Sequence, residues 1–112
     1  MTGADESQAR TTIAADCAEA ISRLDRRTGI WLQVHARPPQ RIALARKTDG
    51  STTEDFWLVT DHTGNDDANF RVVYDDVVAR YGIECTILNG VCLFIGFRAS
   101  LVDAVTDIKV FV

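Results

Sequence analysis

The stretch from Thr60 to Asn69, TDHTGNDDAN, gathers three aspartates, two asparagines and a histidine around one glycine. Carboxylates beside an imidazole are the groups that bind metal ions or transfer protons in acid–base catalysis. Asp61, His62 and Asp66 are therefore the first candidates for metal binding or acid–base catalysis. Whether they can take that role depends on how their spacing compares with known geometries.

The spacing in this stretch does not fit a metal site. An EF-hand loop needs a glycine at its sixth position and a distal glutamate, whereas Gly64 is fourth from Asp61 and the distal position after Asn69 holds no glutamate. A zinc helix or a facial triad needs a second histidine close by, and the other histidine, His35, would have to lie on a neighbouring strand. The sequence predicts instead that Gly64 turns the chain and that Asn65 or Asp67 caps a following helix. No metal is predicted.

The three cysteines, Cys17, Cys85 and Cys92, are an odd number in apolar surroundings and do not indicate a disulfide framework. Cys85 and Cys92 have no histidine or cation beside them in the sequence that would favour a reactive thiolate. We therefore predict core cysteines, no catalytic nucleophile and no cofactor.

Charge is unevenly distributed along the 112 residues, whose net charge is −4. The segment from Arg23 to Lys47 carries seven basic residues against Asp25, a charge of +6, so the remainder carries −10. Aromatic and arginine side chains on one strand can hold nucleic acid or a phosphorylated ligand. Nucleic-acid modules usually have a pI above about 9, whereas this chain has a pI of about 5.0. The candidate binding residues in this segment are Trp31, His35, Arg37 and Arg41.

Hydrophobic periodicity predicts one helix and three strands in the first half of the chain. Residues 1–7 are small and polar and are predicted to be a flexible N-terminus, and residues 8–112 are predicted to form a single domain. A helix is predicted over residues 8–26, ended by Gly29. Its apolar stripe consists of Ile13, Cys17, Ile21 and Leu24. Alternating apolar residues predict strands over the segments 30–36, 41–46 and 55–60.

Residues 70–81 carry apolar side chains at helical spacing and predict a helix that ends before Gly82. The β-branched pair Val72-Val73 supports an alternative, in which 70–74 is a strand and only 75–81 is helical. Both interpretations remain open in the sequence, and the helix is favoured.

Asn89-Gly90 lies between two apolar runs and predicts a hairpin with a two-residue turn. This turn would pair Thr86 with Leu93 and Glu84 with Ile95. After the hairpin, Ser100 to Asp103 resembles a capping box, and it predicts a closing helix with Leu101, Val105, Ile108 and Val112 on one stripe.

Together these elements predict an α+β fold with the order α-β-β-β-α-β-β-α, a mainly antiparallel sheet and helices packed on one face. Helices on one face leave apolar residues of the hairpin and of segment 55–60 uncovered, and small proteins often bury such a face in a homodimer. The interface candidates are Trp57, Leu93, Ile95 and Phe97.

The predicted localisation is cytoplasmic. The N-terminus has acidic residues and no apolar core of a signal peptide. The longest apolar run, residues 91–97, is far shorter than the roughly 20 residues that span a membrane.

The first function hypothesis is a non-catalytic protein-interaction domain, such as a chaperone, an immunity protein or a regulator, that acts as a homodimer with a protein partner. The element order and acidity resemble those of the small dimeric class I chaperones of type III secretion, with which no residue motif is shared and from which no site is taken. Two alternatives stay open. One is a binding module for nucleic acid or a phosphorylated ligand that uses residues 23–47, and the other is a small acid–base enzyme that uses His62 and Asp61.

Overall fold

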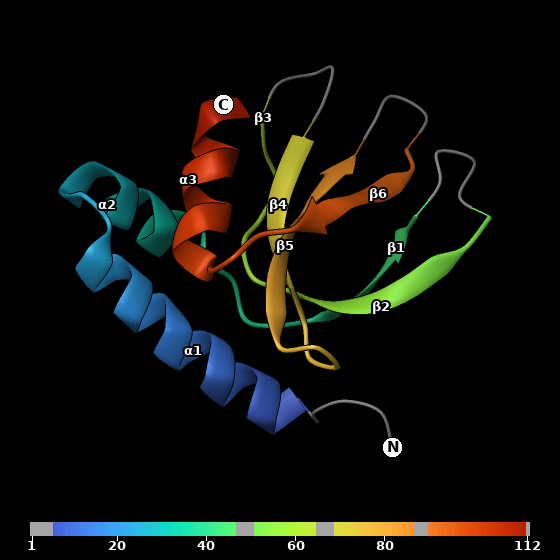
Figure 1. Ribbon diagram of the computed structural model, residues 1–112, viewed down its shortest axis with the longest axis horizontal. Coiled ribbons are helices and arrows are strands. Elements are labelled where there is room, and N and C mark those ends of the chain that lie inside the picture. The colour runs from blue at the N-terminus through green and yellow to red at the C-terminus, as the bar shows by residue number, and fades with distance from the viewer. Residues whose placement is uncertain (1–5, 47–50, 65–68, 87–89, 112) are drawn as a thin grey trace.

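Helices pack against one side of a curled, mainly antiparallel sheet in the computed structural model, which describes residues 6–46, 51–64, 69–86 and 90–111 (Figure 1). The described elements are α1 (Glu6–Arg23), α2 (Arg26–His35), β1 (Arg41–Ala45), β2 (Thr53–Leu58), β3 (Thr63–Gly64), β4 (Asn69–Asp75), β5 (Arg80–Thr86), β6 (Cys92–Phe97) and α3 (Leu101–Phe111). This arrangement confirms the predicted α+β class, the mainly antiparallel sheet and the position of the helices on one face.

The sheet closes on itself. Its strand order is β2-β1-β6-β5-β4-β3, and β2 also pairs with β4 through Trp57↔Tyr74 and Leu58↔Val73. The ring is completed by the parallel contact of β1 with β6 at Ala45↔Leu93, while the other pairs of described strands are antiparallel. Because the sheet is closed, successive residues of a strand point alternately to the inside and to the outside of the ring.

One core fills the inside of the ring and a second lies between the ring and the helices. Leu44, Phe56, Val73 and Phe94 form the inner core, in which the rings of Phe56 and Phe94 stack with centroids 4.6 Å apart. The second core joins all three described helices to the outer side of β2, β4 and β5. It includes Ile13, Leu32, Trp57, Val59, Val72, Tyr74, Tyr81, Ile83, Leu101, Val105 and Ile108.

The first helix ends earlier than predicted, and a second helix replaces the strand predicted over 30–36. Asp25 caps α2 by accepting a hydrogen bond from the Thr28 backbone N–H at 2.8 Å. Gly29 therefore lies inside α2 and does not stop α1. The apolar residues of α2 alternate, which also fits a strand, but the burial of Gly29 and Leu32 follows the helical period against α1 and α3. Packing against these helices decides the conformation of the segment.

The helix predicted over residues 70–81 is wrong, because this segment forms β4, a tight turn and the start of β5. The alternative strand over 70–74 was closer, although no helix follows it. Residues 72 to 75 of β4 are all buried, so no alternation of period two marks the strand in the sequence. Tyr74 and Tyr81 pair across the hairpin with ring centroids 4.7 Å apart, and Asp75 turns the chain by accepting a hydrogen bond from the Val77 N–H at 2.9 Å.

The hairpin of β5 and β6 forms as predicted but in a different register. Thr86 pairs with Cys92, Cys85 with Leu93 and Glu84 with Phe94. The predicted turn residue Asn89 lies outside the described residues. A shift of one residue moves every side chain to the other face of the sheet, so Glu84 and Thr86 share a face with Phe94 inside the ring.

The stretch Thr60–Asn69 contains a short strand, β3, which pairs with the start of β4. The predicted helix caps Asn65 and Asp67 lie outside the described residues, and the next element is strand β4, so the predicted helix start is wrong. The closing helix is confirmed: the Ser100 hydroxyl oxygen accepts from the Asp103 backbone N–H at 3.1 Å, and Leu101, Val105 and Ile108 are buried. Val112 lies outside the described residues.

Ala79, in the turn between β4 and β5, has a φ of 55°. This left-handed conformation disfavours side chains with a Cβ by roughly 1–2 kcal/mol, whereas glycine adopts it freely at a smaller entropic cost in the unfolded chain. We expect Ala79→Gly to raise the free energy of unfolding by about 0.5–1 kcal/mol, measured by chemical denaturation.

The control for this prediction is Ala14→Gly at an exposed position of α1, which should lower the stability by about 1 kcal/mol. If both substitutions destabilise the protein to the same extent, the turn does not hold Ala79 in the left-handed region.

Candidate functional site

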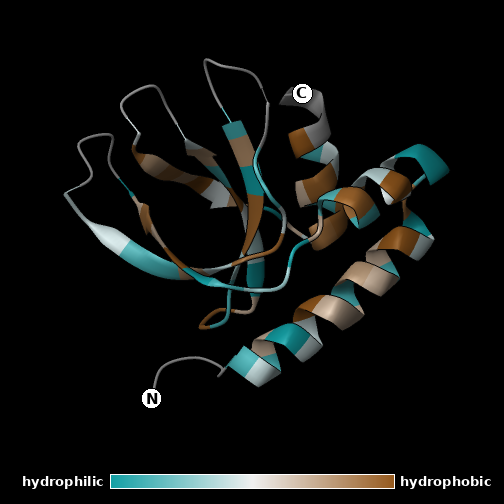
Figure 2. Cartoon of the chain, turned by 180° about the vertical axis from the view of Figure 1, so that it is seen from behind, coloured by the Kyte–Doolittle hydropathy of each residue, from teal (hydrophilic) through white to brown (hydrophobic). Residues whose placement is uncertain are grey.

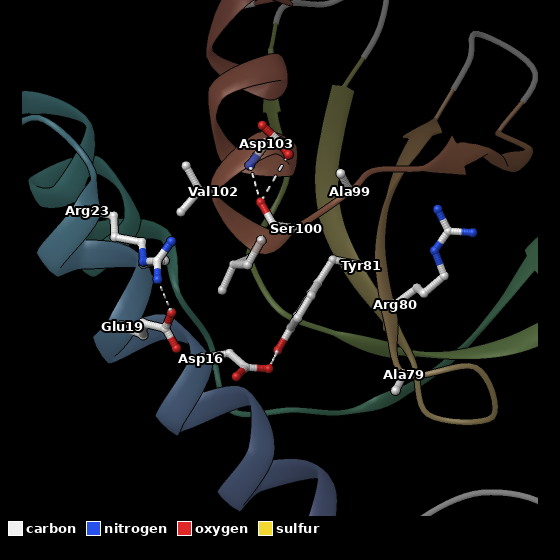
Figure 3. Close-up of a pocket in the computed structure, with 12 residues that line it drawn as sticks. Asp16, Glu19, Arg23, Ala79, Arg80, Tyr81, Ala99, Ser100, Val102 and Asp103 are labelled. Carbon is white, nitrogen blue, oxygen red and sulfur yellow. Dashed lines mark hydrogen bonds and ion pairs between the residues drawn. The ribbon is translucent and has the colours of Figure 1, made fainter.

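A cavity of about 670 Å³ lies between α1, the β4–β5 turn and the start of α3 (Figure 3). Its volume is within the range of about 300–1,000 Å³ common for small-ligand pockets. The lining mixes charged and small apolar side chains: Asp16, Glu19, Ala20, Arg23, Ala79, Arg80, Tyr81, Ala99, Ser100, Leu101, Val102 and Asp103.

Tyr81 and Asp16 meet at this cavity. The Tyr81 hydroxyl donates to Asp16 Oδ2 at 2.6 Å (Figure 3). Glu19 is paired with Arg23 at 3.1 Å, and the Arg80 guanidinium points away and lies over the ring of Phe97 at 4.9 Å. Neighbouring side chains therefore engage both α1 carboxylates of the lining, and the Tyr81–Asp16 bond docks α1 on the sheet.

The Tyr81–Asp16 bond makes a testable contribution to stability. Burial, followed by the hydrogen bond to Asp16, raises the pKa of Tyr81. An unfolded tyrosine ionises near pH 10, so the contribution is complete below pH 10 and is lost as the pH rises above it. We expect Tyr81→Phe to cost about 1 kcal/mol at neutral pH and to lose stability less steeply than the wild type above pH 10.

Denaturation curves between pH 7 and 11 check this expectation. Tyr74→Phe is the matched control, because burial also raises the pKa of Tyr74 but no hydrogen bond to Asp16 contributes. Identical alkaline slopes for the wild type and Tyr81→Phe would rule out the bond as the cause.

A buried carboxylate lies at one end of the ring. Glu84 is 0% exposed, and its Oε2 accepts from Arg71 Nε at 2.8 Å and from His62 Nε2 at 2.9 Å. The Thr86 hydroxyl donates to Glu84 Oε1 and also lies 3.6 Å from Cys92 Sγ. We call these five residues the Glu84 cluster. Strand pairing explains it, because Arg71 faces Glu84 across β4 and β5 and Cys92 faces Thr86 across β5 and β6.

His62 does not form a proton relay within the Glu84 cluster. Its Nε2 contacts both Glu84 Oε2 and Thr86 Oγ1, the latter at 3.0 Å. A catalytic triad needs a histidine that contacts its carboxylate through one ring nitrogen and its nucleophile through the other. Because both partners share a single nitrogen here, His62, Glu84 and Thr86 do not form such a triad. The hypothesis of acid–base catalysis by His62 with Asp61 stays a prediction.

Cys17 and Cys85 lie where unreactive thiols are expected. Burial and the neighbouring Asp16 raise the pKa of Cys17 to about 11. Burial and then Glu84 raise the pKa of Cys85. A raised pKa keeps both thiols protonated near neutral pH, which opposes a role as nucleophile.

Three of the four predicted binding residues come together around Asp61. The Asp61 carboxylate contacts His35 Nδ1 at 2.7 Å and Arg37 at 2.6 Å, and the ring of Trp31 lies 4.8 Å from that of His35. These contacts join the end of α2 to the chain after β2. The fourth residue, Arg41, lies on β1 over the ring of Trp57 at 4.7 Å and pairs with Asp76 at 3.4 Å.

The four interface candidates do not share one surface. Trp57 is 5% exposed and belongs to the core between sheet and helices. Gly82 pairs with Phe97 while Glu84 pairs with Phe94, so β6 has one extra residue at this point. This bulge turns Phe97 toward the ring of Phe94, 4.9 Å away. Leu93 is half-buried, and Ile95 is 37% exposed.

α2 exposes one continuous stripe of side chains. We call this stripe the α2 face, and it consists of Arg26, Arg27, Ile30, Gln33, Val34 and, just after the helix, Arg37. Ile30 and Val34 are 49% and 60% exposed and lie one helical turn apart. Figure 2 shows the hydrophilic junction of α1 and α2 beside the more hydrophobic middle of α2.

Sequence reasoning missed several of these residues. It predicted a strand for α2, so Ile30 and Val34 were placed inward. It also missed Glu84 and Arg71, although each is a charged residue within an apolar strand and such a residue requires a partner when buried.

Comparisons with protein-family models, curated proteins and solved structures give no match to this chain. Within the described residues, no group of three or more His, Cys, Asp or Glu side chains is placed to hold a metal ion. None of the described helices has the length and apolar character of a membrane span.

Proposed function

We propose that the protein is a cytoplasmic, non-catalytic protein-interaction domain that docks a partner protein on the α2 face. The observation that carries this proposal is the exposure of Ile30 and Val34, two large aliphatic side chains on neighbouring turns of one helix. Single exposed apolar residues are ordinary on protein surfaces. Two that lie side by side form a patch, and interaction surfaces commonly have such a patch within a polar rim.

The rest of α2 is firmly held, which suits a docking surface. Asp25 caps its first turn, Leu32 is fully buried, and Arg37 donates to the Val34 and Ala36 carbonyl oxygens at its end, both at 2.9 Å. A helix that is already ordered loses little conformational entropy when a partner binds.

A photo-crosslinking residue in place of Gln33, at the centre of the α2 face, tests the proposal. In extracts of the source cell we expect a covalent adduct with a discrete partner protein. The adduct should disappear when Ile30→Ser and Val34→Ser are added, because these changes remove the apolar contact area.

Two controls make the result specific. A crosslinker at Thr11, which is exposed on α1, should give no such adduct. Val77→Ser with Val78→Ser removes two exposed aliphatic side chains from the β4–β5 turn and should leave the Gln33 adduct unchanged. A lack of adduct at Gln33, or the same adduct at Thr11, would refute the proposal.

The predicted homodimer is a separate proposal that Leu93 and Ile95 still support. Light scattering of the concentrated protein checks it, since a dimer has twice the chain mass of 12.4 kDa. We expect Ile95→Lys to shift such a dimer to the monomer by placing a charge in an apolar contact. A wild-type protein of one chain mass at high concentration would exclude the homodimer.

A further inference from the structure

The arginines of the α2 face indicate the chemistry of the partner. Arg26 and Arg27 occupy the first turn of α2, which contains no acidic residue after the N-cap Asp25. The first turn is the positive end of the helix dipole, where acidic side chains stabilise a helix and basic ones destabilise it. Arg26 and Arg27 therefore destabilise α2. Binding to a partner would explain why arginines occupy these positions.

The same two arginines are unpaired in the described part of the chain. No described carboxylate forms an ion pair with Arg26 or Arg27. Their neighbours differ, because Arg23 pairs with Glu19 and Arg37 pairs with Asp61. The α2 face thus combines two available positive charges with the aliphatic side chains of Ile30 and Val34.

We infer that the partner presents an acidic amphipathic segment to the α2 face, an inference that rests on the proposed function. Arg26 to Val34 covers about 12 Å along the helix axis, at 1.5 Å per residue. A partner helix of two to three turns covers this length. Its aliphatic side chains pack on Ile30 and Val34, and its carboxylates pair with the arginines, which gives electrostatic complementarity.

Two other occupants fit the surface less well. Nucleic acid is held by aromatic side chains on which bases stack, but Trp31 packs into the helix–sheet core and against His35, and neither belongs to the α2 face. A second copy related by two-fold symmetry brings the same patch against itself. The α2 face contains three arginines and no acidic residue, so a second copy would offer no carboxylate to pair with Arg26 and Arg27.

A peptide titration followed by amide NMR tests the inference. The probe is a synthetic helical peptide of about 12 residues with leucines one turn apart and flanking glutamates, and its control has glutamine at every glutamate position. We expect saturable shifts on the α2 face, weaker binding of the glutamine peptide, and an affinity that falls as salt rises. Arg27→Glu should weaken binding by about tenfold or more.

The matched control is Arg10→Glu, which makes the same change of charge at an exposed position of α1 and should bind almost as the wild type does. Arg27→Glu adds an acid to the first turn of α2 and is expected to fold at least as stably as the wild type. Equal affinities for both variants, or equal binding of both peptides, would overturn the inference.

Other results of these experiments would point to nucleic acid or a second copy of the chain on the α2 face. If a single-stranded oligonucleotide binds the α2 face more tightly than the acidic peptide does, the inference of an acidic partner is overturned. A dimer that Arg27→Glu abolishes would also overturn that inference. A Gln33 adduct whose partner binds Arg27→Glu as well as it binds the wild type refutes the acidic partner and leaves the proposed function standing. The absence of any Gln33 adduct refutes the proposed function itself.

Discussion

Arg71→Ala is expected to lower the free energy of unfolding by about 3–5 kcal/mol. The Arg71 guanidinium donates to Glu84 Oε2 at 2.8 Å, and the Glu84 side chain is fully buried. Removing Arg71 leaves the buried Glu84 carboxylate without its guanidinium partner, with only the contacts of His62 and Thr86 to stabilise it. Loss of one partner of a buried ion pair is one of the largest effects that a single substitution can have. Chemical denaturation measures the loss.

The ion pair of Arg10 with Glu6 is the control for this prediction. Both side chains are exposed, and Arg10→Ala should cost no more than about 1 kcal/mol. Replacing both members of the buried pair, in Arg71→Met with Glu84→Leu, should recover much of the loss, because no unpaired charge remains. If Arg71→Ala costs no more than Arg10→Ala, the Glu84 carboxylate is not held as a buried charge.

Gly82→Ala is expected to destabilise the protein by about 1–3 kcal/mol. A Cβ at Gly82 would overlap the ring of Phe94 and lie 2.8 Å from the Gly96 carbonyl oxygen. Phe94 cannot move freely, because it stacks on Phe56 inside the ring and contacts Phe97. The strain therefore falls on the inner core and on the pairing of β5 with β6.

Two variants separate overpacking from other effects. At Gly29 an added Cβ would lie 3.6 Å from Ile21, an ordinary contact, so Gly29→Ala within α2 should stabilise the protein by up to about 1 kcal/mol. Gly82→Ala combined with Phe94→Leu should cost less than the sum of the two single changes, because the smaller side chain makes room. Additive costs would show that Phe94 does not restrict position 82.

Some elements could be predicted because local signals and tertiary packing agree. Ile13, Cys17, Ile21 and Leu24 form a helical stripe in the sequence, and all four pack in the helix–sheet core. Ser100 and Asp103 mark the start of α3 by their capping pattern. In α2 and β4 the local signals are ambiguous, because short runs of alternating or continuous apolar residues are compatible with a helix and with a strand. Packing against neighbouring elements decides between the two.

The Glu84 cluster could not be predicted from the sequence, because it depends on register. The predicted turn placed Glu84 opposite Ile95, and the observed pairing with Phe94 moves it to the inside of the ring. A period of two makes a strand sensitive to a shift of one residue. His62 was recognised as notable from its type, but its contact with Glu84 joins segments that are separated by 22 positions.

The most direct test of the α2 face as the docking surface is a calorimetric titration with the partner identified by the Gln33 crosslink. It compares the wild type with Ile30→Ser/Val34→Ser and with the control Val77→Ser/Val78→Ser. We expect the α2 variant to bind at least about tenfold more weakly than the wild type, and the control to bind like the wild type. Equal affinities of the α2 variant and the wild type would contradict it.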